Sequence, residues 1–129
     1  MENEGLHRDY DCEYFNPEVE TLSRDMIEAL QVKRLKDTVT HCMNSPFYRK
    51  RFEDAGLSVD DIKTLDDIRK IPFTTKQDLR DTYPFGIASV PLEQCTRLHS
   101  SSGTTGNPTV ILHTAQDIDE WANQVARNM

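Results

Sequence analysis

The sequence is poor in cysteine, with only Cys12, Cys42 and Cys95 among 129 residues. The number is odd, the three residues lie far apart, and no two of them form a Cys-x-x-Cys pair. This pattern indicates neither a disulfide framework nor a zinc site. We therefore expect reduced thiols, which suits the cytoplasm.

Positive charge is also scarce, because 15 Lys and Arg residues face 22 Asp and Glu residues and leave a formal net charge of −7. Nucleic acids and anionic membranes both favour positive patches, so we expect neither as a partner. Met1 to Cys12 lack the apolar core of an export signal, and nowhere do about eighteen apolar residues run together. The sequence thus predicts no export signal, no membrane span and a cytoplasmic location.

The length suits one α/β domain with a modest core, which buries roughly two-thirds of the surface of the unfolded chain. Composition and patterning predict three stretches. We expect a mobile polar arm over residues 1–14, a helical region over 15–90 and a strand-loop-strand-helix unit over 91–129. The histidines show no metal-pair spacing, and we expect no metal ligands.

Helix signals recur along the first ninety residues. Ser23 is the predicted N-cap of a long amphipathic helix that ends near residues 44–46. A second helix is predicted over 47–55, ended by Gly56. Two short helical turns should follow, starting at Ser58 and Thr64 and turning these apolar residues inward: Val59, Ile62, Leu65 and Ile68.

The last part of the chain predicts two short strands followed by a helix. Cys95, Arg97 and His99 alternate with their neighbours before a loop, and a β-branched, apolar run over 109–112 follows it. Thr114 and Asp117 have capping-box spacing for a final helix. Its apolar residues form one stripe: Ile118, Trp121, Ala122, Val125 and Met129.

The loop between these strands is the most informative feature, because Ser100–Pro108 packs five hydroxyls and two glycines into nine residues. Glycines allow the main chain to curl round an anion with several N–H groups pointing inward, and hydroxyls add rotatable donors. The loop therefore predicts a phosphate cradle. The expected phosphate-binding residues are Ser101, Ser102, Gly103, Thr104, Thr105 and Gly106.

Two other interpretations of the loop were considered. A polar hairpin turn has similar composition and is the plainer alternative. A Walker P-loop is excluded, because it needs four residues between its glycines, then Lys and Ser or Thr, and a helix directly after. Here two residues separate Gly103 from Gly106, and no lysine follows.

With its flanking strands, the loop resembles the nucleotide phosphate-binding signature of the adenylate-forming ligases, the acyl-CoA synthetase and luciferase superfamily. Three further stretches resemble the phenylacetate-coenzyme A ligase group in particular. They are Tyr14–Glu20, Pro46–Phe52 and Pro72–Asp81, the last followed closely by Tyr83–Gly86. The likeness runs from about Tyr14 to the last residue.

The resemblance implies the helix-rich N-terminal portion of the large domain of such an enzyme. Members of the group activate a carboxylic acid with ATP and then transfer the acyl group from an acyl-adenylate to coenzyme A. The implied cofactors are ATP, Mg²⁺ and coenzyme A, and the implied substrate is an aryl-acetic or related acid. Family enzymes continue beyond the position of Met129, so we expect a truncated or split ligase whose isolated chain is inactive.

The match to the group depends on two positions where a lysine is expected, one in the loop and one upstream of it. The group usually carries Lys where this chain has Asn107, so the loop lacks that cation. Unpaired phosphate charge is costly to desolvate, which weakens the expectation of tight ATP binding. Lys76 is the other candidate, in the first turn of a helix capped by Thr74 and Gln77. It is either a solvated surface lysine or a catalytic residue that meets the substrate carboxylate or the α-phosphate.

Further candidates come with plainer alternatives. His99 ends the strand that leads into the loop and resembles a family position, so it is a tentative ligand contact. The run Arg49–Arg51 is interpreted as a solvated helix face rather than a phosphate or CoA site.

For the chain as a whole, the alternative to a ligase part is a non-catalytic partner-binding or regulatory relic. The apolar stripe of the last helix predicts self-association or pairing with the remainder of the ligase.

Overall fold

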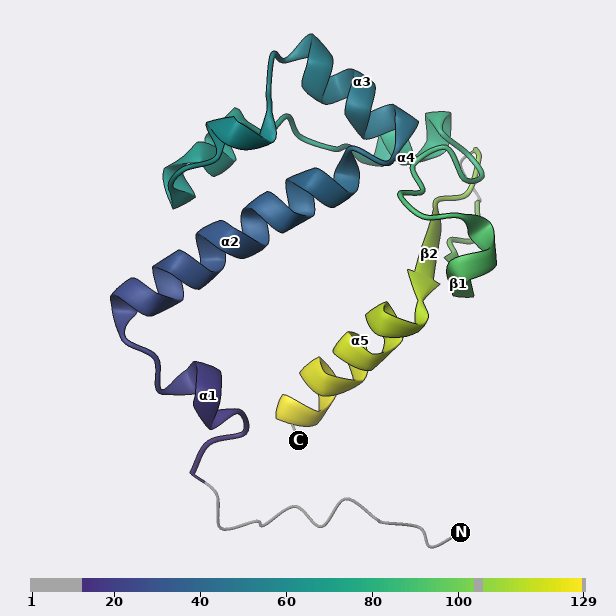
Figure 1. Ribbon diagram of the computed structural model, residues 1–129. Coiled ribbons are helices and arrows are strands. Elements are labelled where there is room, and N and C mark those ends of the chain that lie inside the picture. Colours follow the sequence, from purple (N-terminus) through teal and green to yellow (C-terminus); the bar gives the residue numbers. More distant parts are fainter. Residues whose placement is uncertain (1–12, 104–105, 129) are drawn as a thin grey trace, which may run out of the picture.

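The computed structural model describes residues 13–103 and 106–128. Helices and 3₁₀ turns make up its first part, and a hairpin and a last helix its second (Figure 1). The elements are α1 (Pro17–Glu20), α2 (Arg24–Cys42), α3 (Pro46–Asp54), η1 (Val59–Asp61), η2 (Leu65–Lys70), α4 (Lys76–Asp81), η3 (Leu92–Gln94), β1 (Cys95–Ser100), β2 (Val110–Thr114) and α5 (Ala115–Arg127). Most of the arm expected over 1–14 lies outside the described residues.

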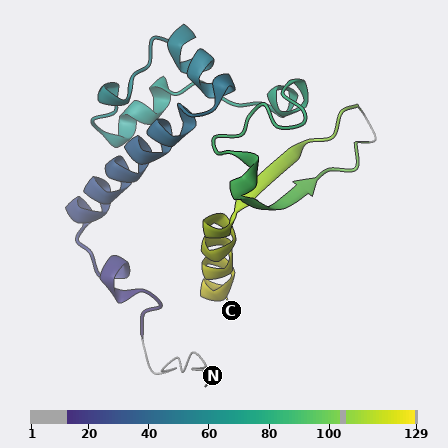
Figure 2. The same cartoon turned by 45° about the vertical axis from the view of Figure 1, so that its right-hand side comes forward.

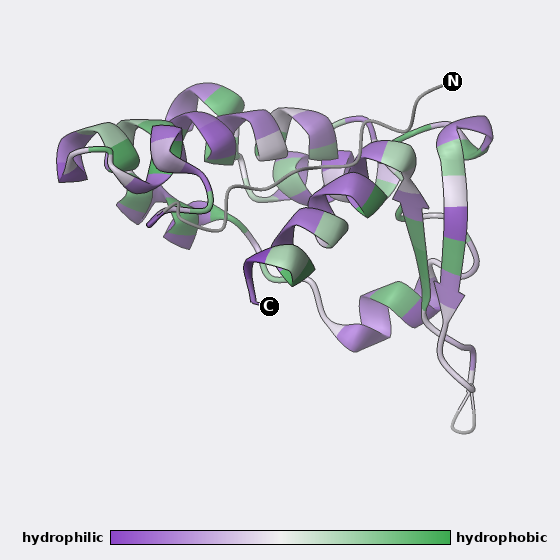
Figure 3. Cartoon of the chain, turned by 90° about the horizontal axis from the view of Figure 1, so that it is seen from below, coloured by the Kyte–Doolittle hydropathy of each residue, from purple (hydrophilic) through white to green (hydrophobic). Residues whose placement is uncertain are grey.

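The long helix α2 begins where the sequence indicates and ends at Cys42, slightly before the predicted end near residues 44–46. The Ser23 hydroxyl accepts a hydrogen bond from the amide of Met26 at 3.4 Å, which caps one of the free amides of the first turn. Its apolar face is buried toward the C-terminal end, at Val39, and is exposed at Met26. Figure 3 shows hydrophobic residues in short patches between hydrophilic ones along the helices. Among the described residues, no helix is long and apolar enough to cross a membrane.

The core of the helical part is small. Its buried residues come from α2, α3 and the turns after α3: Val39, Phe52, Leu57 and Ile62. Gly56 ends α3 with a φ of 62°, a left-handed conformation that suits glycine. The chain can then turn back over α2, so that Ile62 is completely buried.

The turns η1 and η2 form where predicted, but one of their apolar residues was assigned wrongly. Both turns have reciprocal capping boxes, Ser58 with Asp61 and Thr64 with Asp67. Ile68 was expected inside, yet 57% of it is exposed. Because η2 is a 3₁₀ helix with about three residues per turn, its side chains do not follow the α-helical spacing. Ile71 packs against the core instead.

A segment that we call the clamped stretch, Phe73–Asp78, is tied to α3. The Arg51 guanidinium binds both carboxylate oxygens of Asp78, at 2.8 and 3.1 Å, and donates to the carbonyl of Phe73 at 2.8 Å. The Thr74 hydroxyl donates to the hydroxyl of Tyr48 at 3.2 Å. Arg51 is therefore half-buried and paired, which corrects the interpretation of all of Arg49–Arg51 as solvated.

The cap of α4 also lies one residue later than predicted. Thr75, not Thr74, is the N-cap, and its capping box is completed by Asp78 rather than Gln77. Asp78 binds Thr75 and Arg51 at the same time, and this double contact explains why Thr75 is the N-cap. Lys76 is nevertheless in the first turn of α4, as the sequence indicates.

The strands β1 and β2 form an antiparallel hairpin with Arg97 opposite His113 and Ser100 opposite Val110. Figure 2 shows that the hairpin extends away from α2 and α3. Thr114 ends β2 and caps α5 through Asp117, as predicted. The far end of α5 lies near α1, where Arg127 pairs with Glu20 at 2.7 Å (Figure 1).

The small core predicts unequal costs for two isoleucines close in sequence. Ile62→Ala should lower the free energy of unfolding by about 2 to 5 kcal/mol, because it opens a cavity in the core. Ile68→Ala should change it by about 0.5 kcal/mol or less, because Ile68 is mostly exposed. Urea unfolding followed by circular dichroism measures both. Equal costs would contradict this description of the core.

The Arg51–Asp78 pair predicts a loss of stability in acid. The Arg51 guanidinium, with the amide and hydroxyl of Thr75, lowers the pKa of Asp78 from 3.8 to about 2. Its contribution to stability is thus complete above pH 3.8 and lost as the pH falls toward 2. In Asp78→Asn, the unfolding free energy should decrease less between pH 5 and pH 2.5 than in the unchanged chain. Identical decreases, measured by urea unfolding at each pH, would contradict the prediction.

Candidate functional site

The predicted phosphate loop lies at the tip of the hairpin, and its base is closed by two hydrogen bonds. The amide of Ser101 donates to the carbonyl of Thr109 at 3.0 Å. The amide of Thr109 donates in turn to the hydroxyl of Ser101, also at 3.0 Å. The two ends of the loop are thereby held together, and the chain between them has to reverse direction within a few residues.

Glycine makes this reversal possible. Gly103 and Gly106 have φ values of 66° and 132°, which side chains disfavour. The amide of Gly106 donates to the carbonyl of Gly103 at 3.2 Å, and a Cβ on Gly103 would lie 3.2 Å from the carbonyl oxygen of Gly106. A side chain at Gly103 would therefore strain this turn. Thr104 and Thr105, also expected to bind phosphate, lie outside the described residues.

Some of the hydrogen-bond donors of the loop remain available. Within the described residues, the amides of Ser102 and Gly103 have no acceptor, whereas that of Gly106 is used by the turn. The Ser101 hydroxyl accepts from Thr109 but keeps its own proton to donate. Ser101 and Ser102 are exposed. These neutral donors fit a phosphate group, but residues 100–109 include no Lys or Arg to balance its charge.

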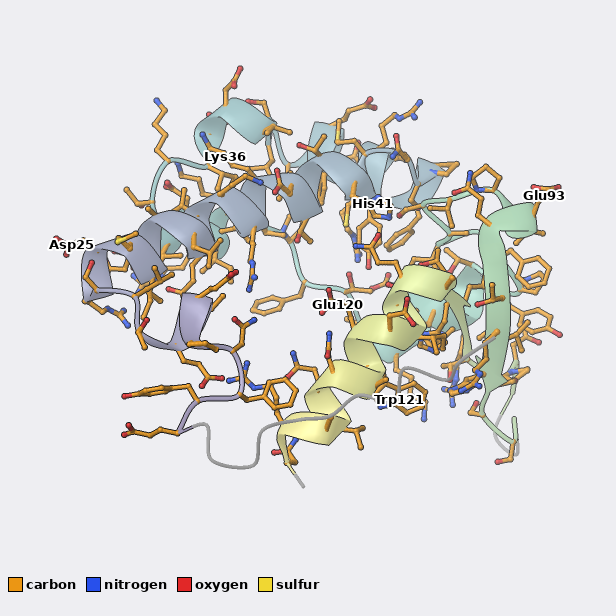
Figure 4. All side chains as sticks on the ribbon, turned by 60° about the horizontal axis from the view of Figure 1, so that its bottom comes forward. Asp25, Lys36, His41, Glu93, Glu120 and Trp121 are labelled. Carbon is orange, nitrogen blue, oxygen red and sulfur yellow. The ribbon has the colours of Figure 1, made fainter. Side chains whose placement is uncertain are left out.

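His99 directly precedes the loop and belongs to a cluster of rings. Its ring centroid lies 4.9 Å from that of His113 on β2 and 5.5 Å from that of Trp121 on α5. Figure 4 shows Trp121 on the side of α5 that faces the hairpin. The cluster joins the base of the loop to α5 and fixes the orientation of His99. A contact between His99 and a ligand stays a prediction.

Lys76, the candidate catalytic residue, is exposed on α4. Within the described residues, no hydrogen bond or ion pair involves Lys76, and no contact joins it to the loop. The amide of Asp78 donates to the Thr75 hydroxyl, so one of the first amides of α4 is already capped by its own N-cap side chain.

A cavity that the sequence did not indicate lies between the helical part and the hairpin. Its volume is about 270 Å³. Most of its lining is apolar, and it also includes His41 at the end of α2 and Asp117 on α5. The lining comes from six helices and strands and the segment 84–90, so no spacing along the chain could have predicted it. Within the described residues, no group of three or more His, Cys, Asp or Glu side chains is placed to hold a metal ion.

Comparison with known proteins gives a consistent result for sequence and fold. No family model matches the chain. The chain is 55% identical over 112 residues to the phenylacetate-coenzyme A ligase of Escherichia coli strain K12, a match of 86% of this chain and 26% of that protein. It is 46% identical over 126 residues to the phenylacetate-coenzyme A ligase of Pseudomonas putida, covering 97% of this chain and 28% of that protein.

Solved structures agree. A 2-hydroxyisobutyryl-CoA ligase in complex with 2-HIB-AMP and CoA superposes on 98% of this chain with a TM-score of 0.85 and 30% sequence identity. The match covers 28% of that structure. The chain thus spans about a quarter of the length of the relatives it matches. Over that length it belongs to the phenylacetate-coenzyme A ligase group of the adenylate-forming enzymes.

Proposed function

We propose that this chain supplies the ATP phosphate-binding part of an AMP-forming ligase that converts phenylacetate or a related aryl acid into its CoA thioester. The observation that carries the proposal is the Gly103–Gly106 hydrogen bond of the loop, with amide donors at Ser102 and Gly103 that no described residue accepts. It occurs within a chain 46% to 55% identical to phenylacetate-coenzyme A ligases. Because the chain spans about a quarter of those proteins, the activity is proposed for a ligase that contains it.

The proposed reaction has two group transfers. A carboxylate oxygen of the acid attacks the α-phosphorus of ATP, forms an O–P bond and expels pyrophosphate. The coenzyme A thiol then attacks the acyl carbon, loses its proton and expels AMP. For the first transfer the loop holds the β- and γ-phosphates in line, so that the leaving charge meets donors that are already oriented. Mg²⁺ would supply the positive charge that residues 100–109 lack.

Two side chains are proposed to act beside the loop. The Lys76 ammonium meets the substrate carboxylate or the α-phosphate, where charge moves during adenylation. His99 lies next to Ser100, and its ring packs against the rings of His113 and Trp121. Both roles are supported by the exposure of these side chains next to segments that packing or hydrogen bonds hold in place.

One observation favours a second candidate function. The resemblance implies Lys where this loop has Asn107, so less positive charge would face the bound phosphates. A chain that keeps the fold but has lost nucleotide affinity would be a non-catalytic partner-binding or regulatory module. ATP affinity separates this candidate from a ligase part.

Location and partners complete the proposal. We place the protein in the cytoplasm, where its proposed substrates ATP and coenzyme A occur. On α5, Trp121 and Val125 are exposed, and an apolar face of this kind is typically covered in an assembly. We propose that it is covered by a second copy of the chain or by the remainder of a ligase.

The proposed function predicts that this chain can replace its counterpart in an active relative. We expect the Escherichia coli phenylacetate-coenzyme A ligase, with its 112-residue matching segment exchanged for that of this chain, to form phenylacetyl-CoA. Chromatography of the thioester and a coupled pyrophosphate assay measure the two transfers. We call this protein the exchanged ligase.

Its control is the exchanged ligase with Gly103→Val, which keeps every donor side chain but disfavours the turn. We expect this control to fold and to lose pyrophosphate release. An exchanged ligase that folds, as judged by circular dichroism, yet adenylates no acid would contradict the proposal and favour the non-catalytic module.

Restoring the missing cation should improve ATP binding. In the exchanged ligase, Asn107→Lys should lower the KM for MgATP about tenfold, because a charged donor replaces a neutral one beside the phosphates. Asn107→Gln, which lengthens the side chain without adding charge, is the control and should leave the KM within about twofold. The gain should shrink at high salt. An unchanged KM in Asn107→Lys would mean that this position does not face the nucleotide.

A further inference from the structure

The position of Lys76 is set by its backbone segment alone. The side chain is exposed, and no hydrogen bond or ion pair holds it within the described residues. Its amine can therefore be placed only as accurately as the clamped stretch, Phe73–Asp78, that carries it. Contacts outside α4 have to fix this stretch, because a helix of six residues is only marginally stable alone.

One guanidinium fixes the stretch at both ends. Nη1 of Arg51 donates to the carbonyl of Phe73 at 2.8 Å and to Oδ2 of Asp78 at 2.8 Å. Nη2 of Arg51 reaches Oδ1 of Asp78 at 3.1 Å, so the carboxylate is held by both arms of the fork. Lys76 lies between these two attachment points. The exposed fractions of the two side chains, 31% for Arg51 and 17% for Asp78, show that the pair is partly screened from water.

Arg51 is itself well anchored. The guanidinium carbon lies 4.9 Å from the centre of the Phe47 ring, one turn back on α3. The next residue, Phe52, is buried in the core and packs against Tyr48. Since Tyr48 also accepts the hydrogen bond of Thr74, α3 holds the stretch at three points. A continuous chain of contacts thus connects the core to the backbone that carries Lys76.

We propose that Arg51 is a positioning residue for adenylation, which holds the Phe73–Asp78 backbone so that the Lys76 amine reaches the reacting carboxylate or α-phosphate. The inference rests on the proposed function of Lys76. It assigns to Arg51 no contact with substrate. Its effect is to limit how far Lys76 can move, and displacement of a reacting group by about 1 Å can cost about a hundredfold in rate.

The neighbouring Lys50 provides a matched control. It lies on the same helix and pairs only with Asp54, at 2.9 Å, with exposed fractions of 75% and 64%. Such an exposed pair one turn apart contributes little to stability. Removing the charge of Lys50 changes the local charge as much as removing that of Arg51, but it touches neither end of the stretch.

The first experiment measures the stretch in the full chain by amide hydrogen exchange. Two amides report on α4, because Leu79 donates to the carbonyl of Thr75 and Thr82 to that of Asp78. In Arg51→Met, which keeps the apolar stem, both should exchange at least tenfold faster. In Lys50→Met they should be unchanged. Unchanged protection in Arg51→Met would overturn the inference, whatever the activity.

The second experiment measures coupling in the exchanged ligase. Arg51→Met and Lys76→Ala should each lower kcat for pyrophosphate release by about ten- to a hundredfold, and the double variant should be no more than about twofold below Lys76→Ala. Arg51→Lys should recover only part of the rate, because an ammonium cannot hold both ends as the fork does. Thioester formation from added phenylacetyl-adenylate should stay within about twofold in Arg51→Met.

Each result separates positioning from a general loss of structure. If the two single effects multiply in the double variant, or if both transfers slow equally, Arg51 acts through overall folding and the inference fails while the proposed function stands. If Lys76→Ala has no effect, Lys76 has no part in adenylation and the positioning role fails with it. If the unmutated exchanged ligase folds but is inactive, the proposed function itself is contradicted.

Discussion

The buried contact of Val39, Phe52, Leu57 and Ile62 is the constraint on which the rest of the structure depends. This core is small, and the elements near the candidate site lie outside it. Their positions are therefore set mainly by polar ties between elements. Arg51 ties α4 to α3, Thr114 joins β2 to α5 through its cap, and Arg127 joins the end of α5 to Glu20. Such ties depend on direction, which suits segments that must present one side chain accurately.

Aspartates near the starts of helices and 3₁₀ turns fix several of these elements by capping them. Asp61, Asp67, Asp78 and Asp117 each complete a capping box, and hydrogen bonds from the caps or from paired cations lower the pKa of all four carboxyls. They stay ionised well below neutral pH, so the caps keep their charge. Some of the acidic residues that give the chain its net negative charge therefore serve as helix caps.

The candidate loop would meet a phosphate with neutral groups only, because residues 100–109 include no Lys or Arg. Its geometry is a glycine turn closed at the base by Ser101 and Thr109. Neutral donors orient an anion but do not balance its charge, so a metal ion or a cation from elsewhere has to do so. Lys76, the candidate cation, belongs to α4 and not to the loop. Its position depends on the contact between α3 and α4.

The sequence alone determined the local features, because caps, glycine positions and apolar spacing act within a few residues. Ser23, Gly56 and Thr114 begin or end helices where predicted, and the loop with its two strands was identified from its composition. Tertiary structure decided what depends on partners far along the chain. Arg51 meets Asp78 27 positions later, which changed both the predicted cap of α4 and the interpretation of the basic run. The 3₁₀ geometry of η2 exposed Ile68, and three separate elements brought His99, His113 and Trp121 together. The spacing of residues along the sequence does not predict such contacts, because the fold brings together residues that lie far apart in the chain.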